Sequence, residues 1–229
     1  MPYLILIIVL LLILVFVPQW WARYVFRKHS QPREDIQGSG SELAEHLLAK
    51  MNIRDVGVEQ TDKGDHYDPE ARMVRLSEEN FAGKSLTAVA VAAHEVGHAI
   101  QHHRRERALQ RRTELVKVAQ WSQQLGAGLM FAIPVIALLT RMPHSGVMLF
   151  LAGLASMGVA TVVHLVTLPV EWDASFRKAL PMLRHGGYVG PKDAVAIRSI
   201  LLAAALTYVA ASLASLLNLS RWLVMLRRG

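Results

Sequence analysis

The chain has 229 residues, of which 52% are hydrophobic and 19% are charged, and it contains no cysteine. This composition is too apolar for an ordinary soluble domain and too charged for a bare membrane bundle, and it excludes disulfides and thiolate metal sites. The formal net charge of +7 favours contact with anionic lipid over contact with nucleic acid. A membrane protein with one modest water-facing domain fits these limits.

The first element that the sequence predicts is a membrane anchor. Tyr3–Val17 is a continuous apolar run that ends at Pro18 and the pair Trp20 and Trp21. With the two Trp side chains at the interface, this segment could reach the roughly 20 residues that a helical span needs. The alternative is a cleaved signal peptide, but no positive charge precedes the run and no small-residue cleavage site follows it. We therefore expect an uncleaved anchor over residues 1–21.

One helix and two strands are expected in the segment that follows the anchor. Ser39 and Glu42 can form a capping box for a helix from about Gly40 to Met51. Alternating apolar residues predict strands at Ile53–Gln60 and Arg72–Leu76. A long loop rich in Asp and Gly would join these two strands.

The loop between the predicted strands contains His66 and Asp68. Either residue could support an active site or contact a substrate. The alternative is turn chemistry, in which Asp68 and Pro69 start a turn. The sequence alone gives about equal support to these two interpretations.

The strongest chemical signal is the pattern H-E-x-x-H, formed by His94, Glu95 and His98. Ser85 and the Ala- and Val-rich stretch that follows favour a helix here, and on a helix positions i and i+4 lie on one face. Both histidines can then ligate one Zn²⁺ at about 2.0–2.1 Å. Glu95 can take a proton from water on the metal's open side. Gly97, a poor helix former, would let another backbone or a substrate come close.

The second half of the chain predicts three more membrane spans. A strongly basic tract after the zinc-site helix favours a solvated or lipid-facing helix side over nucleic-acid binding. Apolar runs at Leu125–Leu139 and Val147–Leu168 predict a transmembrane hairpin over residues 122–169. A polar segment, residues 170–199, precedes a last apolar run, which predicts a C-terminal span and tail over residues 200–229. The excess of Lys and Arg in the segments flanking the hairpin predicts that these segments are cytoplasmic.

Two histidines do not complete a catalytic zinc site, which usually has three protein ligands. Glu171 is the best candidate for the third ligand because it follows a predicted span and lies on the same predicted side of the membrane as the zinc-site helix. The alternative is that Glu171 is an interfacial carboxylate paired with Arg177. Ser175, one turn beyond Glu171, could hydrogen-bond a ligand histidine. Asp173 points away from Glu171 on a helix and is expected to be a supporting or structural group. His164, in an apolar run, is either a functional intramembrane residue or a buried histidine bonded to a carbonyl.

Motifs distributed over nearly the whole chain resemble the YugP-like family of neutral zinc metallopeptidases, which are bacterial membrane proteins. Besides the N-terminal anchor, the matching runs are His66–Pro69, Val74–Ser77, Ala92–Gln101 and Leu168–Ser175. The resemblance implies a zinc-dependent peptidase of the bacterial inner membrane, with His94 and His98 as ligands and Glu95 as the catalytic carboxylate. By similarity to gluzincins, whose third ligand is a Glu on a later helix, it supports Glu171. Ser175 departs from this pattern, because many gluzincins have Asp at that position.

We therefore predict a mainly α-helical, multi-pass membrane protein with four transmembrane helices and a small α+β zincin-like unit of the gluzincin type. The unit would occupy residues 22–121 on the cytoplasmic side, with the third ligand supplied by residues 170–199. The expected function is hydrolysis of protein or peptide substrates at the membrane surface, with one Zn²⁺ per chain. The expected partners are the lipid bilayer and a substrate that adds to an edge strand at Arg72–Leu76, and not nucleic acid. The alternative is a non-enzymatic scaffold with structural zinc, which a closed fourth ligand such as His66 would favour.

Overall fold

The computed structural model describes residues 2–140, 148, 162–163 and 166–207. It divides into two compact units: residues 1–17, 111–167 and 208–229 form the first, and residues 18–110 and 168–207 form the second. The described residues of the first unit are helical. They belong mainly to the beginning of helix α1 (Pro2–His29) and to most of helix α5 (Arg107–Thr140).

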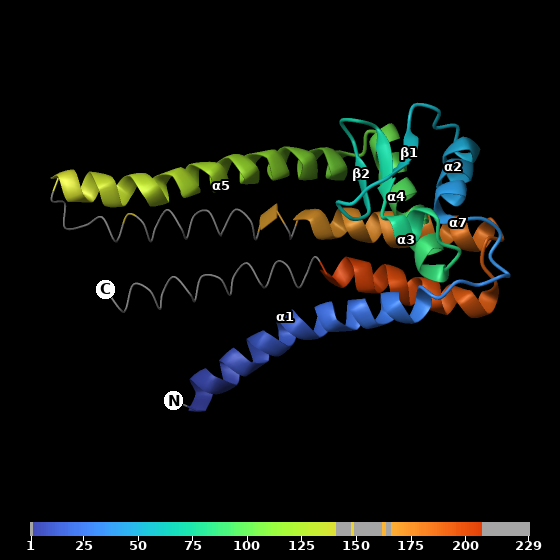
Figure 1. Ribbon diagram of the computed structural model, residues 1–229, viewed down its shortest axis with the longest axis horizontal. Helices are drawn as coiled ribbons and strands as arrows, with labels where there is room; N and C mark the ends of the chain where they lie inside the picture. The colour runs from blue at the N-terminus through green and yellow to red at the C-terminus, as the bar shows by residue number, and fades with distance from the viewer. Residues whose placement is uncertain (1, 141–147, 149–161, 164–165, 208–229) are drawn as a thin grey trace. The chain divides into compact units, whose positions relative to one another are not determined.

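The second unit combines helices with one three-stranded sheet (Figure 1). Besides the end of α1, its helices are α2 (Gly40–Lys50), α3 (Glu78–Phe81), α4 (Leu86–His103), α7 (Leu180–His185) and a helix at residues 191–207. Its strands are β1 (Gly57–Gln60), β2 (His66–Asp68) and β3 (Met73–Leu76). A π-helix, η1 (Asp173–Ala179), lies between the helical residues 166–172 and α7.

Two helix starts follow directly from the sequence. In α2, the Ser39 Oγ accepts a hydrogen bond from the Glu42 backbone N–H, and the Glu42 carboxylate accepts one from the Ser39 N–H at 2.8 Å. The predicted capping box is therefore confirmed. In α4, the Ser85 Oγ accepts from the Ala88 N–H at 3.1 Å, so the helix that carries H-E-x-x-H begins where expected. Each cap satisfies an N–H group that has no partner within the helix, which is typically worth about 1 kcal/mol.

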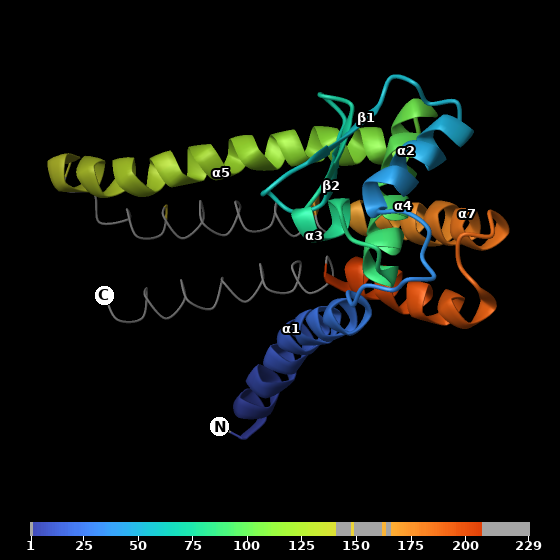
Figure 2. The same cartoon turned by 45° about the vertical axis from the view of Figure 1, so that its right-hand side comes forward.

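The sheet has the strand order β1-β3-β2, with β1 parallel and β2 antiparallel to β3. The prediction that Arg72–Leu76 is an edge strand is wrong, because β2 forms within the expected loop and covers the second side of β3. Arg75 of β3 joins all three strands through ion pairs to Glu59 of β1 and Asp68 of β2, each at 2.5 Å. Figures 1 and 2 both show this sheet beside α4, and β2 and β3 contact that helix.

The core of the second unit surrounds α4. Nearly every residue of this helix from Leu86 to Gln101 is buried. The helix packs against β2, β3, α2, α3, η1 and α7. Val74 and Leu76 of β3 and Leu47 of α2 are among the most deeply buried side chains of the core. A helix enclosed in this way has little freedom to move, because protein interiors are close-packed, and it therefore fixes the positions of the side chains that it carries.

Within the part of the chain that the structure describes, no helix combines the length and the apolar character that crossing a membrane requires. The predicted fold with four transmembrane helices is therefore wrong, and the described part of the chain is mostly helical with a small sheet. The four spans were predicted from apolar runs. Two of these runs, Tyr3–Val17 and Leu125–Leu139, are each shorter than the roughly 20 apolar residues of a span. The first part of α5 is also rich in arginine. The two remaining predicted spans, Val147–Leu168 and residues 200–219, lie mostly outside the described residues.

Candidate metal centre

His94 and His98 lie one turn apart on α4 and point toward the same place. Their Nε2 atoms are 3.2 Å apart, and their ring planes are inclined at 83°. Both residues are buried, with exposed fractions of 7% and 4%. The helix thus presents two ring nitrogens side by side in a water-poor environment, as the i, i+4 spacing predicts.

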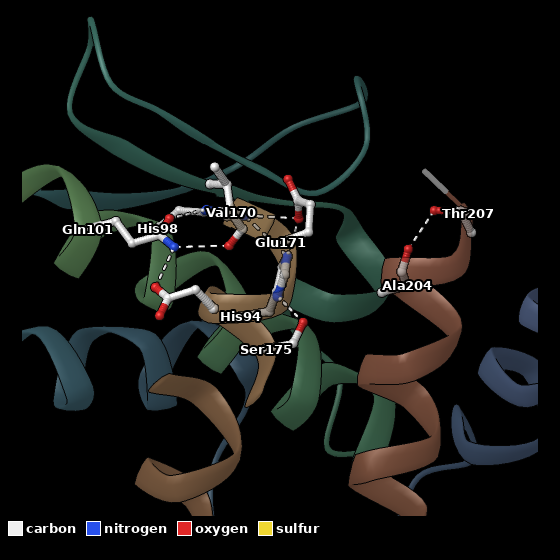
Figure 3. A network of polar contacts seen from close by, with 9 residues as sticks. His94, His98, Gln101, Val170, Glu171, Ser175, Ala204 and Thr207 are labelled. Carbon is white, nitrogen blue, oxygen red and sulfur yellow. Dashed lines mark hydrogen bonds and ion pairs between the residues drawn. The ribbon is translucent and has the colours of Figure 1, made fainter. Parts of the chain in front are cut away.

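Glu171 brings a third ligand atom to these nitrogens from a distant part of the sequence (Figure 3). Its Oε2 lies 3.0 Å from the His94 Nε2 and 3.2 Å from the His98 Nε2. The Glu171 side chain is completely buried. Among the described residues, these three side chains form a group that could hold a metal ion, with ligand atoms within 4.8 Å of one another.

The spacing of the three atoms suits zinc. A tetrahedral zinc ion with bonds of about 2.0–2.1 Å separates its ligand atoms by roughly 3.3 Å. The observed separations of 3.0–3.2 Å agree with that value within a few tenths of an ångström. Two imidazoles and one carboxylate are also a donor set that zinc commonly uses, and three protein ligands leave one position for water or substrate. The residues present therefore fit this ion.

The charge of Glu171 is set by its histidine neighbours. Burial by itself raises the pKa of the carboxyl group, but attraction to His98 and hydrogen bonds with His94 and His98 outweigh it. The pKa of Glu171 is consequently held well below its usual value. The side chain is therefore an anion at neutral pH, which is the form that binds a divalent cation.

Gly97 allows α4 and η1 to come into backbone contact. A Cβ atom at this position would lie 2.9 Å from the carbonyl oxygen of Ala174 and 3.3 Å from its Cα. The expectation that a small residue between the histidines admits another backbone is confirmed. Ala174 lies between Glu171 and Ser175, so this contact sets how closely both side chains approach α4.

Ser175 holds the second nitrogen of His94. Its Oγ lies 3.1 Å from the His94 Nδ1, while Glu171 contacts the Nε2 of the same ring. Both residues come from the same helical segment, one on each side of the contact with Gly97. The imidazole of His94 is therefore held at both of its nitrogens.

Gln101, which was not among the predicted site residues, holds His98 in a similar way. Its Oε1 lies 2.9 Å from the His98 Nδ1, and its Nε2 donates to the Val170 carbonyl at 2.9 Å and to the Asp173 carboxylate at 2.8 Å. Its exposed fraction is 1%. The available signal was its position three residues after His98, since side chains at i and i+3 are neighbours on a helix. Asp173 is thus linked to His98 through Gln101.

Two further predicted candidates, His66 and Asp68, lie on β2. The His66 Nδ1 meets the Gly64 carbonyl oxygen at 2.8 Å. Asp68 accepts hydrogen bonds from two backbone N–H groups that follow it, at 2.9 and 3.0 Å, and forms its ion pair with Arg75. Neither residue is among the three described side chains that could hold a metal ion. Asp68 thus shows the turn chemistry that was one of the two interpretations, while contact of either residue with a substrate stays a prediction.

Glu95 and His164 complete the set of predicted site residues. Glu95 is buried on α4 next to His94, with an exposed fraction of 6%. His164 lies outside the described residues. The structure therefore brings His94, His98 and Glu171 together and surrounds them with residues that orient the histidines.

Comparison with known proteins agrees with this geometry. Residues 3–227 match the family described as "Putative neutral zinc metallopeptidase". The chain is also 36% identical over 217 residues to "Putative membrane protease YugP" of Bacillus subtilis (strain 168), and the match covers 92% of each chain. No solved structure matches. The chain belongs to the neutral zinc metallopeptidase family.

Proposed function

We propose that the protein is a zinc-dependent peptidase whose centre is formed by His94, His98 and Glu171. The observation that carries this proposal is the buried triangle of ligand atoms with sides of 3.0–3.2 Å. When bound there, zinc would supply Lewis acidity, which polarises a peptide carbonyl and makes water more acidic. Three protein ligands suit such a role because catalytic zinc sites keep one position open.

Glu95 is the proposed general base. It directly follows a ligand residue on α4 and is turned from it by about 100° around the helix axis, so it neighbours the centre without occupying a ligand position. A carboxylate in this place can accept the proton of the attacking water and return it to the leaving amine. His94 and His98 are held by Ser175 and Gln101 while this proton moves.

An extended substrate would add to β2. This strand is an edge strand, it contacts α4, and its outer side can pair with a peptide backbone. β1 is the other edge strand, and it packs against α2 and α3. A peptide paired with β2 would therefore lie beside the helix that carries the two histidines.

The scaffold alternative has less support. A structural zinc site is usually closed by four protein ligands. The group found among the described residues has three members, and His66, the suggested fourth, contacts the Gly64 carbonyl oxygen instead. An open ligand set favours catalysis.

We also propose that the protein acts at the surface of the bacterial inner membrane. The name of the Bacillus subtilis relative includes "membrane protease". The net charge of +7 would favour contact with anionic lipid headgroups. Flotation with vesicles tests the proposal: the protein should bind vesicles containing anionic lipid more strongly than neutral ones, and equal binding would contradict it.

Zinc analysis combined with a peptide-cleavage assay tests the proposed centre. The purified protein should bind about one zinc per chain, and His94→Ala or His98→Ala should lose most of it. Glu171→Gln replaces an anionic ligand with a weak neutral one, so both zinc affinity and peptide cleavage should fall. Full zinc retention by all three variants would reject the centre.

A further inference from the structure

Lys178 is a buried lysine outside the proposed metal centre. Its side chain is 8% exposed and forms ion pairs with Asp173 and, at 3.0 Å, with Glu106. Burying an ammonium group is costly unless it is paired and hydrogen-bonded. Neither of its partners is a proposed metal ligand or general base. The position of this charge therefore needs a separate explanation.

A continuous series of hydrogen bonds connects Lys178 to a metal ligand. The Asp173 Oδ2 accepts hydrogen bonds from the Lys178 Nζ and, at 2.8 Å, from the Gln101 Nε2. The Gln101 Nε2 also donates to the Val170 carbonyl at 2.9 Å. At the other end of the amide, the Gln101 Oε1 lies 2.9 Å from the His98 Nδ1 (Figure 3). The lysine is thus three hydrogen bonds away from the imidazole of His98.

The direction of these bonds determines where His98 carries its proton. A carbonyl oxygen and a carboxylate paired with Lys178 can only accept, so the NH₂ group of Gln101 must face Val170 and Asp173. The amide oxygen then faces the His98 Nδ1, which must donate. In a neutral imidazole the other nitrogen, Nε2, consequently has a free lone pair. This is the nitrogen that lies beside Glu171 and His94.

We propose that Lys178 is a positioning residue for metal binding, which acts through Asp173 and Gln101 to select the His98 tautomer that can ligate a metal through Nε2. This inference rests on the proposed zinc centre. Since Gln101 also bonds to the backbone of Val170, next to Glu171, the same series of bonds holds ligands from two separate elements together. Loss of such a supporting partner typically lowers metal affinity by about 10–100-fold.

Lys178→Met, in the full-length chain, tests the proposal through zinc affinity and ring protonation. Zinc affinity, measured by competition with a chelator, should fall by roughly tenfold or more. In zinc-free protein at about pH 8, nitrogen NMR of the imidazoles should show a single Nδ1–H tautomer for His98 in the wild type and a mixture in the variant. Lys192→Met removes the same charge from an exposed position and should change neither quantity.

A double-mutant cycle separates this role from a merely structural one. Lys178→Met and Gln101→Leu should be non-additive in zinc affinity because they break the same series of bonds, whereas Lys178→Met and Ser175→Ala should be additive. Asp173→Asn tests the same link if Lys178→Met does not fold. Unchanged zinc affinity and tautomer in the folded variant, or full additivity with Gln101→Leu, would overturn the proposal. Peptide cleavage is not a readout, so an inactive wild-type protein would count against the proposed function alone.

Discussion

Gly97→Ala is a small change with an expected effect on both stability and metal binding. The new methyl group would lie 2.9 Å from the Ala174 carbonyl oxygen and 3.4 Å from its carbonyl carbon. These are backbone atoms, which cannot rotate away as the end of a flexible side chain can. To restore ordinary contact, α4 and η1 must move apart by roughly 0.3–0.5 Å, because close-packed interiors have no free volume to absorb the methyl group.

The energetic cost follows from two opposing effects. Overpacking of this kind costs about 1–3 kcal/mol. Replacing glycine by alanine inside a helix gains about 1 kcal/mol. We therefore expect a net loss of up to about 2 kcal/mol in the free energy of unfolding, in zinc-free protein. The same displacement would lengthen the contacts of 3.0 and 3.1 Å that Glu171 and Ser175 make with His94, so zinc affinity should also fall.

Thermal unfolding with and without zinc measures both effects. A tenfold loss in affinity reduces the stabilisation by saturating zinc by about 1.4 kcal/mol. Gly190→Ala is the matched control, because a Cβ there would meet no atom within 4 Å. If Gly97→Ala unfolds at the same temperature as Gly190→Ala and zinc stabilises both variants equally, the proposed contact between α4 and η1 does not position the ligands.

Three further predictions concern pH, the sheet and a supporting hydroxyl. Burial raises the pKa of Asp173, but hydrogen bonds from Gln101 and Lys178 outweigh it and leave the pKa below the ordinary 3.8. A carboxylate with a lowered folded-state pKa contributes stability above its unfolded-state pKa and loses it as the pH falls through the folded-state value. In urea unfolding of zinc-free protein, the free energies of unfolding of wild type and Asp173→Asn should therefore differ by a constant amount above about pH 5. This difference should shrink as the pH falls below about 3.8. Arg75→Leu removes the ion pairs to both neighbouring strands and should lower the free energy of unfolding, measured with urea, more at low salt than at high salt. An equal loss at both salt concentrations would contradict an ionic role. Ser175→Ala removes the bond to the Nδ1 of a ligand histidine and should lower zinc affinity by about tenfold in chelator competition, while an unchanged affinity would show that this bond does not support the ligand.

The local parts of the site could be predicted from the sequence. The capping serine Ser85 and the spacing of His94 and His98 depend on the geometry of one helix, which is the same in every protein. Gly97 could be assigned a close contact for the same reason, although its partner Ala174 could not be named.

The link between Gln101 and Asp173 could not be predicted because it depends on a contact between distant segments. Gln101 and Asp173 are 72 positions apart, and their hydrogen bond exists only when η1 packs against α4. Asp173 was placed from the periodicity of an α-helix, but the segment that it begins is a π-helix with a wider turn. Periodicity therefore gave no indication that its carboxylate reaches Gln101.

The errors in the fold have similar causes. β2 lies in a segment rich in Asp and Gly that has little strand propensity, and its pairing with β3 overrides that local preference. The four spans were predicted from the hydrophobicity of apolar runs, while the described helices fall short of what a span needs. Hydrophobicity alone does not distinguish a membrane span from other apolar helices when the run is short.

The most direct test of the proposed function compares peptide cleavage by wild type and Glu95→Gln at equal zinc content. Glu95→Gln keeps the shape of the side chain and removes its basicity. The variant should bind zinc as the wild type does and cleave peptides about 10²–10⁴-fold more slowly, which is the usual contribution of a general base. Cleavage by Glu95→Gln at the wild-type rate would contradict the proposed mechanism.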